Sequence, residues 1–370
     1  MIGRITVAGS LAQKPYQAGH TWQFLQYLLG FRRLGWDVLF LDTLNSDMRG
    51  DLRYVDAVMR EFGLEQSYSV AIDGGSHLGI PRARVLKHLA DSDLLINVMG
   101  FLTDEELLEA VGRRVFLDTD PGFGQMWREL ELADVFSGHD AHVTIGERIG
   151  RPDCAVPTCG LRWVTTPQPV VLAQWPTVPD AAGRAFTSVA SWRGAYGPID
   201  YRGRRYGLRV HEFRKFADLP RVSGGAFELA LDIHPDEEAD LRLLGEGGWS
   251  LADPGRIAKT PDAYRRYIQG SRAELMVAKG MYVESRSGWF SERSICYLAS
   301  GRPVLAQDTG LAELYPVGEG LLTFSTLEEA IAGVEEIRAN YPRHAAAARH
   351  LAEEHFDSDK VLARLVHALL

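Results

Sequence analysis

The sequence predicts an α/β protein built from two doubly wound, Rossmann-like domains that face each other across a cleft. Short apolar runs rich in β-branched residues alternate with segments of helical period, which is the pattern of βαβ units in a parallel sheet. This alternation occurs twice along the 370 residues. A domain usually takes roughly 100–200 residues, so the length also fits two domains. Ligands of such folds bind beyond the carboxyl ends of the strands, and function is therefore expected in the loops that follow strands.

The first half contains five strand candidates and one clear helix. The strands are expected at residues 5–8, 38–41, 94–98, 115–117 and 142–145. The helix is expected over residues 19–34, where apolar side chains recur from Phe24 to Leu29 at the spacing of one helix face. Gly35 is placed to end this helix before the next strand, because glycine readily adopts the left-handed conformation found at helix ends.

A proline-rich stretch separates the halves. From Pro152 to Pro179, six prolines interrupt a segment without helical period, which predicts a linker. Further strands are expected at residues 186–190, 227–231, 275–278, 304–306 and 321–324. The tail, 327–370, is expected to be helical with breaks near 341–342 and 356–358. We therefore assign a first Rossmann-like domain to 1–163, a second to 164–355 and a closing helix to 356–370.

Composition excludes several classes of protein. The chain has 40 Lys+Arg against 49 Asp+Glu, a net charge of −9, which argues against nucleic acid as the main partner. The longest apolar stretch, 94–102, is far short of the ~20 residues that cross a bilayer, and the first residues do not read as a signal peptide. Cys154, Cys159 and Cys296 are an odd, sparse set, as expected for reduced thiols. A cytoplasmic location is expected.

The segment from Lys279 to Gly310 carries the strongest chemical signal. A loop at 285–288 leads into a helix expected to begin near Ser291. A helix start offers free backbone N–H groups and a positive dipole end, which suits a diphosphate. The candidate diphosphate ligands around it are Arg286, Gly288, Ser291, Arg293 and Ser294. The alternative is that Ser291 only caps the helix while both arginines lie in solvent.

Residues 288–310 resemble the nucleotide-sugar site of glycosyltransferases with the two-domain GT-B fold. In the group-1 branch, a glycine-containing loop enters a helix that ends in a small residue, Gly and Pro, as residues 299–304 do here. The following strand ends in a polar turn, as it does at 307–310. The sequence is most similar to bacterial members of that branch, and the resemblance extends more weakly over most of the chain. It implies the GT-B fold, with an acceptor bound by the N-terminal domain (1–163) and a nucleoside-diphosphate-sugar donor bound by the C-terminal domain (164–355). It also implies that the helix at 356–370 crosses back to the N-terminal domain.

One departure from the group-1 pattern concerns the ribose contact. That pattern has two glutamates with seven residues between them, and the second holds the ribose of the donor. The corresponding positions here are Gly288 and Cys296, neither of which is acidic. Glu292 lies one helical turn before Cys296 and could offer a carboxylate instead. Asp308 and Thr309 could meet the diphosphate or the sugar. The retaining or inverting outcome stays open.

Three other residues of the second half could support a donor site. Arg193 follows a strand and would suit a phosphate, with an inter-domain ion pair as the alternative. Lys279 also follows a strand and could neutralise the leaving diphosphate, although a surface lysine is the commoner outcome. Trp249 could stack on a nucleobase, although an indole at such a position more often packs in a core or at its rim.

Two residues of the first half are catalytic candidates. His20 lies at the start of the first helix, where the positive dipole end keeps an imidazole neutral and able to accept a proton. In a retaining enzyme it would instead bind the transferred sugar, and its alternative role is capping. Asp120 follows the strand at 115–117 and could orient or deprotonate the acceptor. An Asp before Pro-Gly is also an ordinary turn residue, and Asp118 could cap the backbone there.

The sequence favours chemistry without a metal. His139 and His142 would point to opposite faces of a strand, and no third ligand is evident. A serine-hydrolase elbow, a Walker loop and a Gly-x-Gly-x-x-Gly fingerprint are absent.

We therefore expect a hexosyltransferase-type glycosyltransferase that moves a sugar from a nucleoside-diphosphate sugar to a hydroxyl of a small-molecule or glycan acceptor. It would need no cofactor beyond the donor. The alternatives are a nucleotide-sugar 2-epimerase-like enzyme and a catalytically silent homologue that supports a partner glycosyltransferase. The base, the sugar, the acceptor and the oligomeric state stay open.

Overall fold

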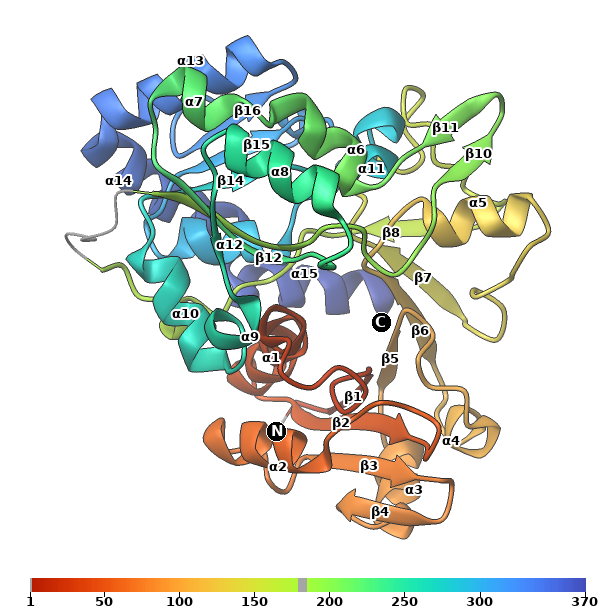
Figure 1. The fold of residues 1–370 in the computed structure, drawn as a ribbon. Helices are drawn as coiled ribbons and strands as arrows, with labels where there is room; N and C mark the ends of the chain where they lie inside the picture. Colours follow the sequence, from red (N-terminus) through yellow and green to blue (C-terminus); the bar gives the residue numbers. More distant parts are fainter. Residues whose placement is uncertain (1, 179–184) are drawn as a thin grey trace.

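The computed structural model describes residues 2–178 and 185–370 and contains two α/β domains, the first below the second in Figure 1. The sheet of the first domain has the order β4-β3-β2-β1-β5-β6-β7-β8. All its strands are parallel except β4, which pairs antiparallel to β3. The strands are β1 (Arg4–Ala8), β2 (Asp37–Leu44), β3 (Tyr68–Ile72), β4 (Ser76–Gly79), β5 (Leu94–Val98), β6 (Arg114–Asp118), β7 (Ala141–Thr144) and β8 (Trp163–Thr165).

The second domain contains a six-stranded, all-parallel sheet of order β13-β12-β9-β14-β15-β16, the strand order of a doubly wound fold. Its strands are β9 (Phe186–Ser191), β12 (Phe227–Asp232), β13 (Ser250–Ala252), β14 (Ala273–Met276), β15 (Val304–Gln307) and β16 (Leu321–Phe324). A separate antiparallel hairpin, β10 (Ile199–Tyr201) and β11 (Arg204–Tyr206), follows β9. The expectation of two doubly wound domains is confirmed.

Helices connect the strands in both domains. The first contains α1 (Ala18–Arg33), α2 (Leu52–Glu61), α3 (Arg82–Ala90), α4 (Glu105–Glu109) and α5 (Phe123–Glu129). The second contains α6 (Arg209–Phe213), α7 (Leu219–Ser223), α8 (Glu238–Glu246), α9 (Pro254–Ile257), α10 (Pro261–Gly270), α11 (Gly280–Ser285), α12 (Glu292–Ala299), α13 (Leu327–Ala339) and α14 (Tyr341–Leu351). Short helical turns η1 (Leu172–Gln174), η2 (Arg214–Phe216), η3 (Leu311–Glu313) and η4 (Ala352–Phe356) complete them, and α15 (Ser358–Leu369) ends the chain.

Helix α1 forms where the apolar period predicts it. Its buried residues include Phe24, Leu25, Leu28 and Leu29, which belong to the core of the first domain. Gly35 has φ of 90° just beyond the helix, as expected of a residue that ends it. The amino end of α1 lies beyond the carboxyl end of β1, so the residues there face the second domain.

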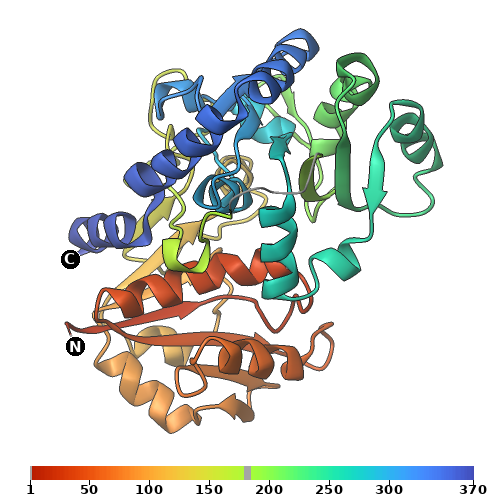
Figure 2. The ribbon, with the colours of Figure 1, turned by 90° about the vertical axis from the view of Figure 1, so that its left-hand side faces the viewer.

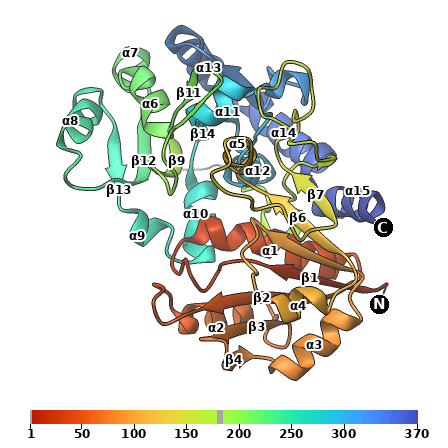
Figure 3. The same ribbon diagram turned by 90° about the vertical axis from the view of Figure 1, so that its right-hand side faces the viewer.

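The domain interface is apolar at its centre. Trp22 of α1 lies 4.9 Å, between ring centroids, from Trp175, which lies 6.3 Å from Tyr264 of α10. The indole nitrogen of Trp22 donates a hydrogen bond to the carbonyl of Pro261 over 3.0 Å. Figure 3 shows α10 and α12 directly above α1. Buried aromatic contacts of this kind hold the two domains in a closed arrangement.

The chain crosses between the domains twice, and the two crossings lie side by side. Val170 and Asp357 pair as an isolated parallel bridge. After the second crossing, α15 packs on α1, where Arg33 donates to both carboxylate oxygens of Asp359 over 3.1 and 2.9 Å. Figure 2 shows these last helices running from the second domain to the first, so that both chain ends lie on one side.

The linker expected from Pro152 to Pro179 needs correction. Strand β8 lies within it and extends the first sheet, so the expected boundary between residues 163 and 164 cuts a strand. Pro179 itself lies outside the described residues, as do residues 180–184 of the expected donor domain. Within the described part of the chain, no helix is long and apolar enough to span a bilayer.

Candidate active site

A chain of three adjoining cavities lies between the domains, at the carboxyl ends of both sheets. The central cavity, of about 410 Å³, shares Gly19, His20 and Val189 with an inner cavity of about 260 Å³. It shares Gln17, Ser191 and Asp232 with an outer cavity of about 670 Å³. Because both domains line these cavities, a ligand held there would touch both at once.

His20 lies where the central and inner cavities meet. Its Nε2 lies 3.0 Å from the hydroxyl oxygen and 3.3 Å from the carbonyl oxygen of Ser10. The pKa of His20 is lowered to about 3, mainly because the ring is buried and secondly because the positive charge of Lys14 lies nearby. The imidazole is therefore neutral at physiological pH, as its position at the start of α1 predicts.

Two arginines of the second domain face these cavities. Arg209, at the start of α6, donates from Nε to the carbonyl of Val277 and from Nη1 to that of Ser191, each over 3.1 Å. Arg293 pairs with the fully buried Glu274 and donates from Nη1 to the carbonyl of Val189 over 2.8 Å. Within residues 2–178 and 185–370, the Nη2 group of each arginine has no hydrogen-bond partner.

Arg209 differs from most arginines of this chain because, within the described residues, it forms no ion pair. Burial lowers its pKa to about 10, with a further contribution from the like charge of Arg293. It therefore stays protonated at neutral pH. A largely buried cation without a carboxylate partner is costly unless a bound anion balances it. This combination marks Arg209 as a candidate phosphate ligand that sequence reasoning missed.

The start of α12 forms a wall of the inner cavity, as expected. Ser291 occupies the N-cap position, but its hydroxyl makes no capping hydrogen bond, so the first N–H groups of α12 stay available for an anion. Ser294 is fully buried, and its hydroxyl has no partner in the described chain. It lines none of the three cavities, so the expected diphosphate contact there has no geometric support.

Glu292 also lines the inner cavity. Its carboxylate accepts from the Cys296 thiol over 2.9 Å and from the amide of Gln26, on α1, over 3.4 Å. Burial raises the pKa of Glu292 to about 7. The Glu292 carboxyl therefore faces the inner cavity. It contacts Cys296, which lies one helical turn later and occupies the position of the ribose-binding glutamate in the group-1 pattern.

Two predicted residues, one from each domain, neutralise each other. Lys279 Nζ lies 2.7 and 2.9 Å from the two carboxylate oxygens of Asp120, and the hydroxyl of Tyr282 donates to the same carboxylate. Lys279 also lies over the rings of Phe123 and Tyr196. A lysine bound in this way has little charge left for a diphosphate, and the same ion pair occupies the Asp120 carboxylate that was expected to meet the acceptor.

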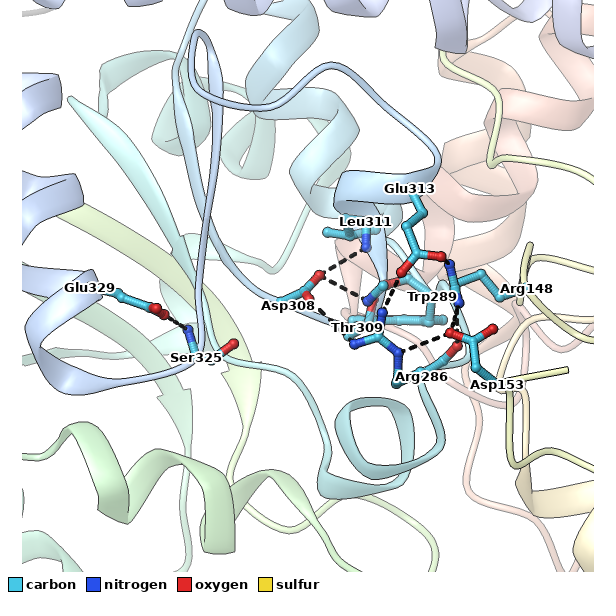
Figure 4. Close-up of polar contacts among 11 residues, drawn as sticks. Arg148, Asp153, Arg286, Trp289, Asp308, Thr309, Leu311, Glu313, Ser325 and Glu329 are labelled. Carbon is cyan, nitrogen blue, oxygen red and sulfur yellow. Dashed lines mark hydrogen bonds and ion pairs between the residues drawn. The ribbon is translucent and has the colours of Figure 1, made fainter. Parts of the chain in front are cut away.

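Four predicted donor residues line none of the three cavities and lie near Arg148 of the first domain. Figure 4 shows three of them, Arg286, Asp308 and Thr309, together with Arg148. Arg286 pairs with Glu313 and Asp153. Gly288 packs against Arg148, Asp308 accepts from the N–H groups of Gly310 and Leu311, and Thr309 donates to the carbonyl of Trp289. The expected diphosphate contacts of Arg286, Gly288, Asp308 and Thr309 therefore need correction, because protein groups already occupy these side chains and turns.

Arg193 and Trp249 have other partners than expected. Arg193 borders the outer cavity but forms a bidentate pair with Glu237, with Nη2 2.8 Å from Oε2. Trp249 is 6% exposed, packs between Phe213 and Phe227, and donates to the carbonyl of Ala217. The expectation that Trp249 stacks on a nucleobase is wrong, because core side chains cover its faces.

The histidines considered as metal ligands serve the local structure. His139 contacts the Asn97 amide and the Phe136 carbonyl, and His142 contacts the same carbonyl. The residues that the structure describes contain no group of three or more His, Cys, Asp or Glu side chains able to hold a metal ion.

Comparison with known proteins finds glycosyltransferases both by sequence profile and by fold. The sequence profile of the family described as "Glycosyl transferase-like" matches residues 228–367. No curated protein matches the chain in sequence. Among solved structures, the fold is similar to an alpha-glucosyltransferase solved with UDP and a 13-mer DNA, with a TM-score of 0.61, 13% identity and 99% of each chain covered.

Two further solved structures share the fold over their full length. HepE of Anabaena, in complex with UDP and glucose, gives a TM-score of 0.58 at 13% identity, with 99% of each chain covered. A mutant form of TarM from S. aureus, in complex with Fondaparinux, alpha-GlcNAc-glycerol and UDP, gives 0.58 at 8%, with 100% of each chain covered. The predicted GT-B fold is thus confirmed, and the family match over residues 228–367 confirms the resemblance to glycosyltransferases.

Proposed function

We propose that the protein is a glycosyltransferase that moves a sugar from a nucleoside-diphosphate sugar to an acceptor hydroxyl. One observation carries the proposal: His20 of the first domain and Arg209 and Arg293 of the second border adjoining cavities. Within the described residues, Nη2 of each arginine has no hydrogen-bond partner. His20 can accept the proton of an acceptor hydroxyl, while the two arginines and the start of α12 can stabilise a leaving diphosphate.

The proposed reaction uses these groups as follows. The acceptor oxygen attacks the anomeric carbon of the donor sugar while the bond from that carbon to the diphosphate oxygen breaks. The bonding pair leaves with the diphosphate, where Arg209, Arg293 and the start of α12 stabilise the added charge. The acceptor proton passes to His20. The negative diphosphate beside His20 favours the protonated imidazole, so donor binding itself raises the basicity that the free protein lacks.

The scheme needs no metal, because two arginines and a helix dipole supply the positive charge that a cation would supply elsewhere. We also propose a bacterial, cytoplasmic enzyme. The free state of Cys154, Cys159 and Cys296 supports a reducing compartment, and the motif at residues 288–310 supports a bacterial origin.

A thermal-shift series with UDP, GDP, dTDP and their sugars tests the donor site. A ligand that binds only the folded protein raises stability in proportion to ln(1 + [L]/Kd), so the right nucleotide should raise Tm. Arg209→Ala should abolish that increase. Arg193→Ala should weaken it less, because Glu237 already neutralises Arg193.

The matched control is Arg205→Ala, because Arg205 pairs with Asp200 on the exposed hairpin and borders none of the three cavities. It should respond to nucleotides like the wild type. If no nucleotide stabilises the wild type, or if Arg209→Ala responds like Arg205→Ala, the proposed donor site is wrong. Nucleotide binding without transfer to any acceptor would favour a catalytically silent homologue.

A further inference from the structure

Arg148 lies at the domain interface, and each of its three side-chain nitrogens has a protein partner. It belongs to the loop after β7 in the first domain, and its side chain is only 3% exposed. The guanidinium pairs with Asp153 of its own loop and with Glu313 of the second domain. Its Nε donates to the carbonyl of Arg286 over 3.2 Å, and its backbone N–H donates to the carbonyl of Ser287 over 3.0 Å.

Two glycines of the second domain make room for this side chain. A Cβ at Gly288 would lie 2.8 Å from Arg148 Cγ and 2.9 Å from its backbone nitrogen. A Cβ at Gly310 would collide with Arg148 Cδ. Both glycines have positive φ, of 73° and 98°, so the two turns that receive Arg148 use a conformation that other residues rarely adopt. The fit indicates a specific docking of Arg148 into the second domain.

The turn that Arg148 supports leads directly to the proposed donor site. Gly288 is followed by Trp289, Phe290 and Ser291, and Trp289 and Ser291 both line the inner cavity. Trp289 also pairs with Gly146, two residues before Arg148, as an isolated β-bridge. The position of the α12 start relative to the cavity therefore depends on contacts that the first domain supplies.

Carboxylates match the positive charges around Arg148. Arg148 and Arg286 face Asp153 and Glu313, and Figure 4 shows the four side chains directed toward one another. Arg286 Nη1 also lies 3.9 Å from Asp308 Oδ2. The Arg148 guanidinium holds the pKa of Glu313 below its ordinary value. Since every charge has a partner, this cluster does not attract an anion, and its role is to connect the domains.

We infer that Arg148 is a positioning residue that couples closure of the two domains to the shape of the donor site. In the closed form it fixes the turn at 286–288 and thereby the start of α12. When the domains separate, Arg148 leaves Gly288 and Gly310, and the turn loses its support. Donor affinity therefore depends on Arg148, a residue of the first domain that lines none of the three cavities. This inference rests on the proposed function.

The test compares nucleotide affinity in matched variants, using the nucleotide among UDP, GDP and dTDP that stabilises the wild type. Arg148→Met keeps the length of the side chain and removes its charge. Its Kd should rise by roughly tenfold or more, measured by calorimetry, because Glu313 and the carbonyl of Arg286 lose the guanidinium that holds them in place. Arg148→Lys should restore only part of the affinity, since one ammonium cannot reproduce the fork that joins two carboxylates and a carbonyl.

The control is Arg343→Met. Arg343 also joins two carboxylates, Glu319 and Glu336, but all three residues belong to the second domain. Its affinity for the nucleotide should equal that of the wild type. With an acceptor available, Arg148→Met should raise KM for the donor and leave KM for the acceptor unchanged, a split that general loss of structure would not give.

Two outcomes separate this inference from the proposed function. If Arg148→Met does not fold, Glu313→Gln replaces it, because Glu313 is half exposed and its substitution should leave the fold intact. Its Kd should rise in the same direction. If folded Arg148→Met or Glu313→Gln binds like the wild type while Arg209→Ala does not bind, the inference about Arg148 is wrong and the donor site stands. If Arg209→Ala binds like the wild type, the donor site itself is wrong.

Discussion

Lys279 of the second domain and Asp120 of the first form an ion pair across the domain interface, with Nζ 2.7 Å from Oδ2. The two side chains are 15% and 19% exposed, so the pair is largely removed from water. Sequence reasoning gave them separate roles, as diphosphate ligand and acceptor base. Their pairing assigns them instead to holding the domains together.

Removing one partner of this pair should destabilise the protein by about 1–3 kcal/mol, because the other charge stays buried without its partner. We expect this from Asp120→Asn and from Lys279→Met, with the free energy of unfolding measured by urea denaturation. The double variant should cost less than the sum of the two, since the second change removes a charge that is already unpaired. The exposed pair of Arg205 and Asp200 is the control, expected to contribute about 0–1 kcal/mol. Strictly additive losses at 120 and 279 would show that the pair is not coupled.

His20 should change its protonation behaviour when a nucleotide binds. In the free protein its pKa is about 3, because burial disfavours the charged ring. A diphosphate at Arg209 and Arg293 would add negative charge nearby and raise that pKa. NMR titration of the imidazole with and without UDP or GDP measures this shift. His20→Gln should lower kcat by about 10²–10⁴ while nucleotide affinity stays close to that of the wild type. An unchanged kcat would exclude His20 as the base.

The sequence predicted most of the buried strands, although it missed β3 (Tyr68–Ile72), of which four residues are buried. Strands such as β5 (Leu94–Val98) and β16 (Leu321–Phe324) are largely apolar runs, because both faces of a parallel sheet are covered. Among the other missed strands, β11 (Arg204–Tyr206) and β13 (Ser250–Ala252) are three residues long and mostly exposed. Such segments form through pairing with neighbours and leave little hydrophobic pattern in the sequence.

The candidate site was predictable only in part. His20 and Glu292 follow from local rules, because each lies near a helix start at the edge of a sheet. Arg286 was misplaced because its neighbour Arg148 comes from a loop 138 residues earlier in the chain, which no local pattern reveals. Arg209 was missed because an arginine at a helix start is usually exposed, and its lack of a carboxylate partner within the described residues becomes visible only in three dimensions.

Glu292 should make stability depend on pH in a defined direction. Burial raises its pKa from the ordinary 4.5 to about 7, so between these values the folded protein holds a proton that the unfolded chain has lost. Its contribution to the free energy of unfolding is therefore fully present below about pH 4.5 and falls as pH rises toward 7, by up to about 1.4 kcal/mol per pH unit. Glu292→Gln cannot titrate, so its stability relative to the wild type should increase from pH 5 to pH 7 in urea denaturation. A difference that stays constant over this range would refute the buried, protonated carboxyl.

The contact between α15 and α1 depends on Gly30. A Cβ at Gly30 would lie 3.1 Å from Ser358 Cβ and would collide with Leu362 Cδ1, so the closing helix lies directly against the α1 backbone. Leu362 is fully buried, and Leu362→Ala should cost about 2–5 kcal/mol. Gly30→Ala should also destabilise, because the new methyl group displaces Leu362.

The two changes should compensate each other when combined, since the methyl group at position 30 would occupy part of the space that the leucine leaves. The double variant is thus expected to unfold at a higher urea concentration than Leu362→Ala alone. Gly245 in α8 is the matched helical glycine, because nothing lies within 4 Å of its added Cβ. Gly245→Ala should be neutral or stabilising by up to about 1 kcal/mol through helix propensity. If Gly30→Ala behaves in the same way and its effect adds to that of Leu362→Ala, α15 does not pack on α1 as described.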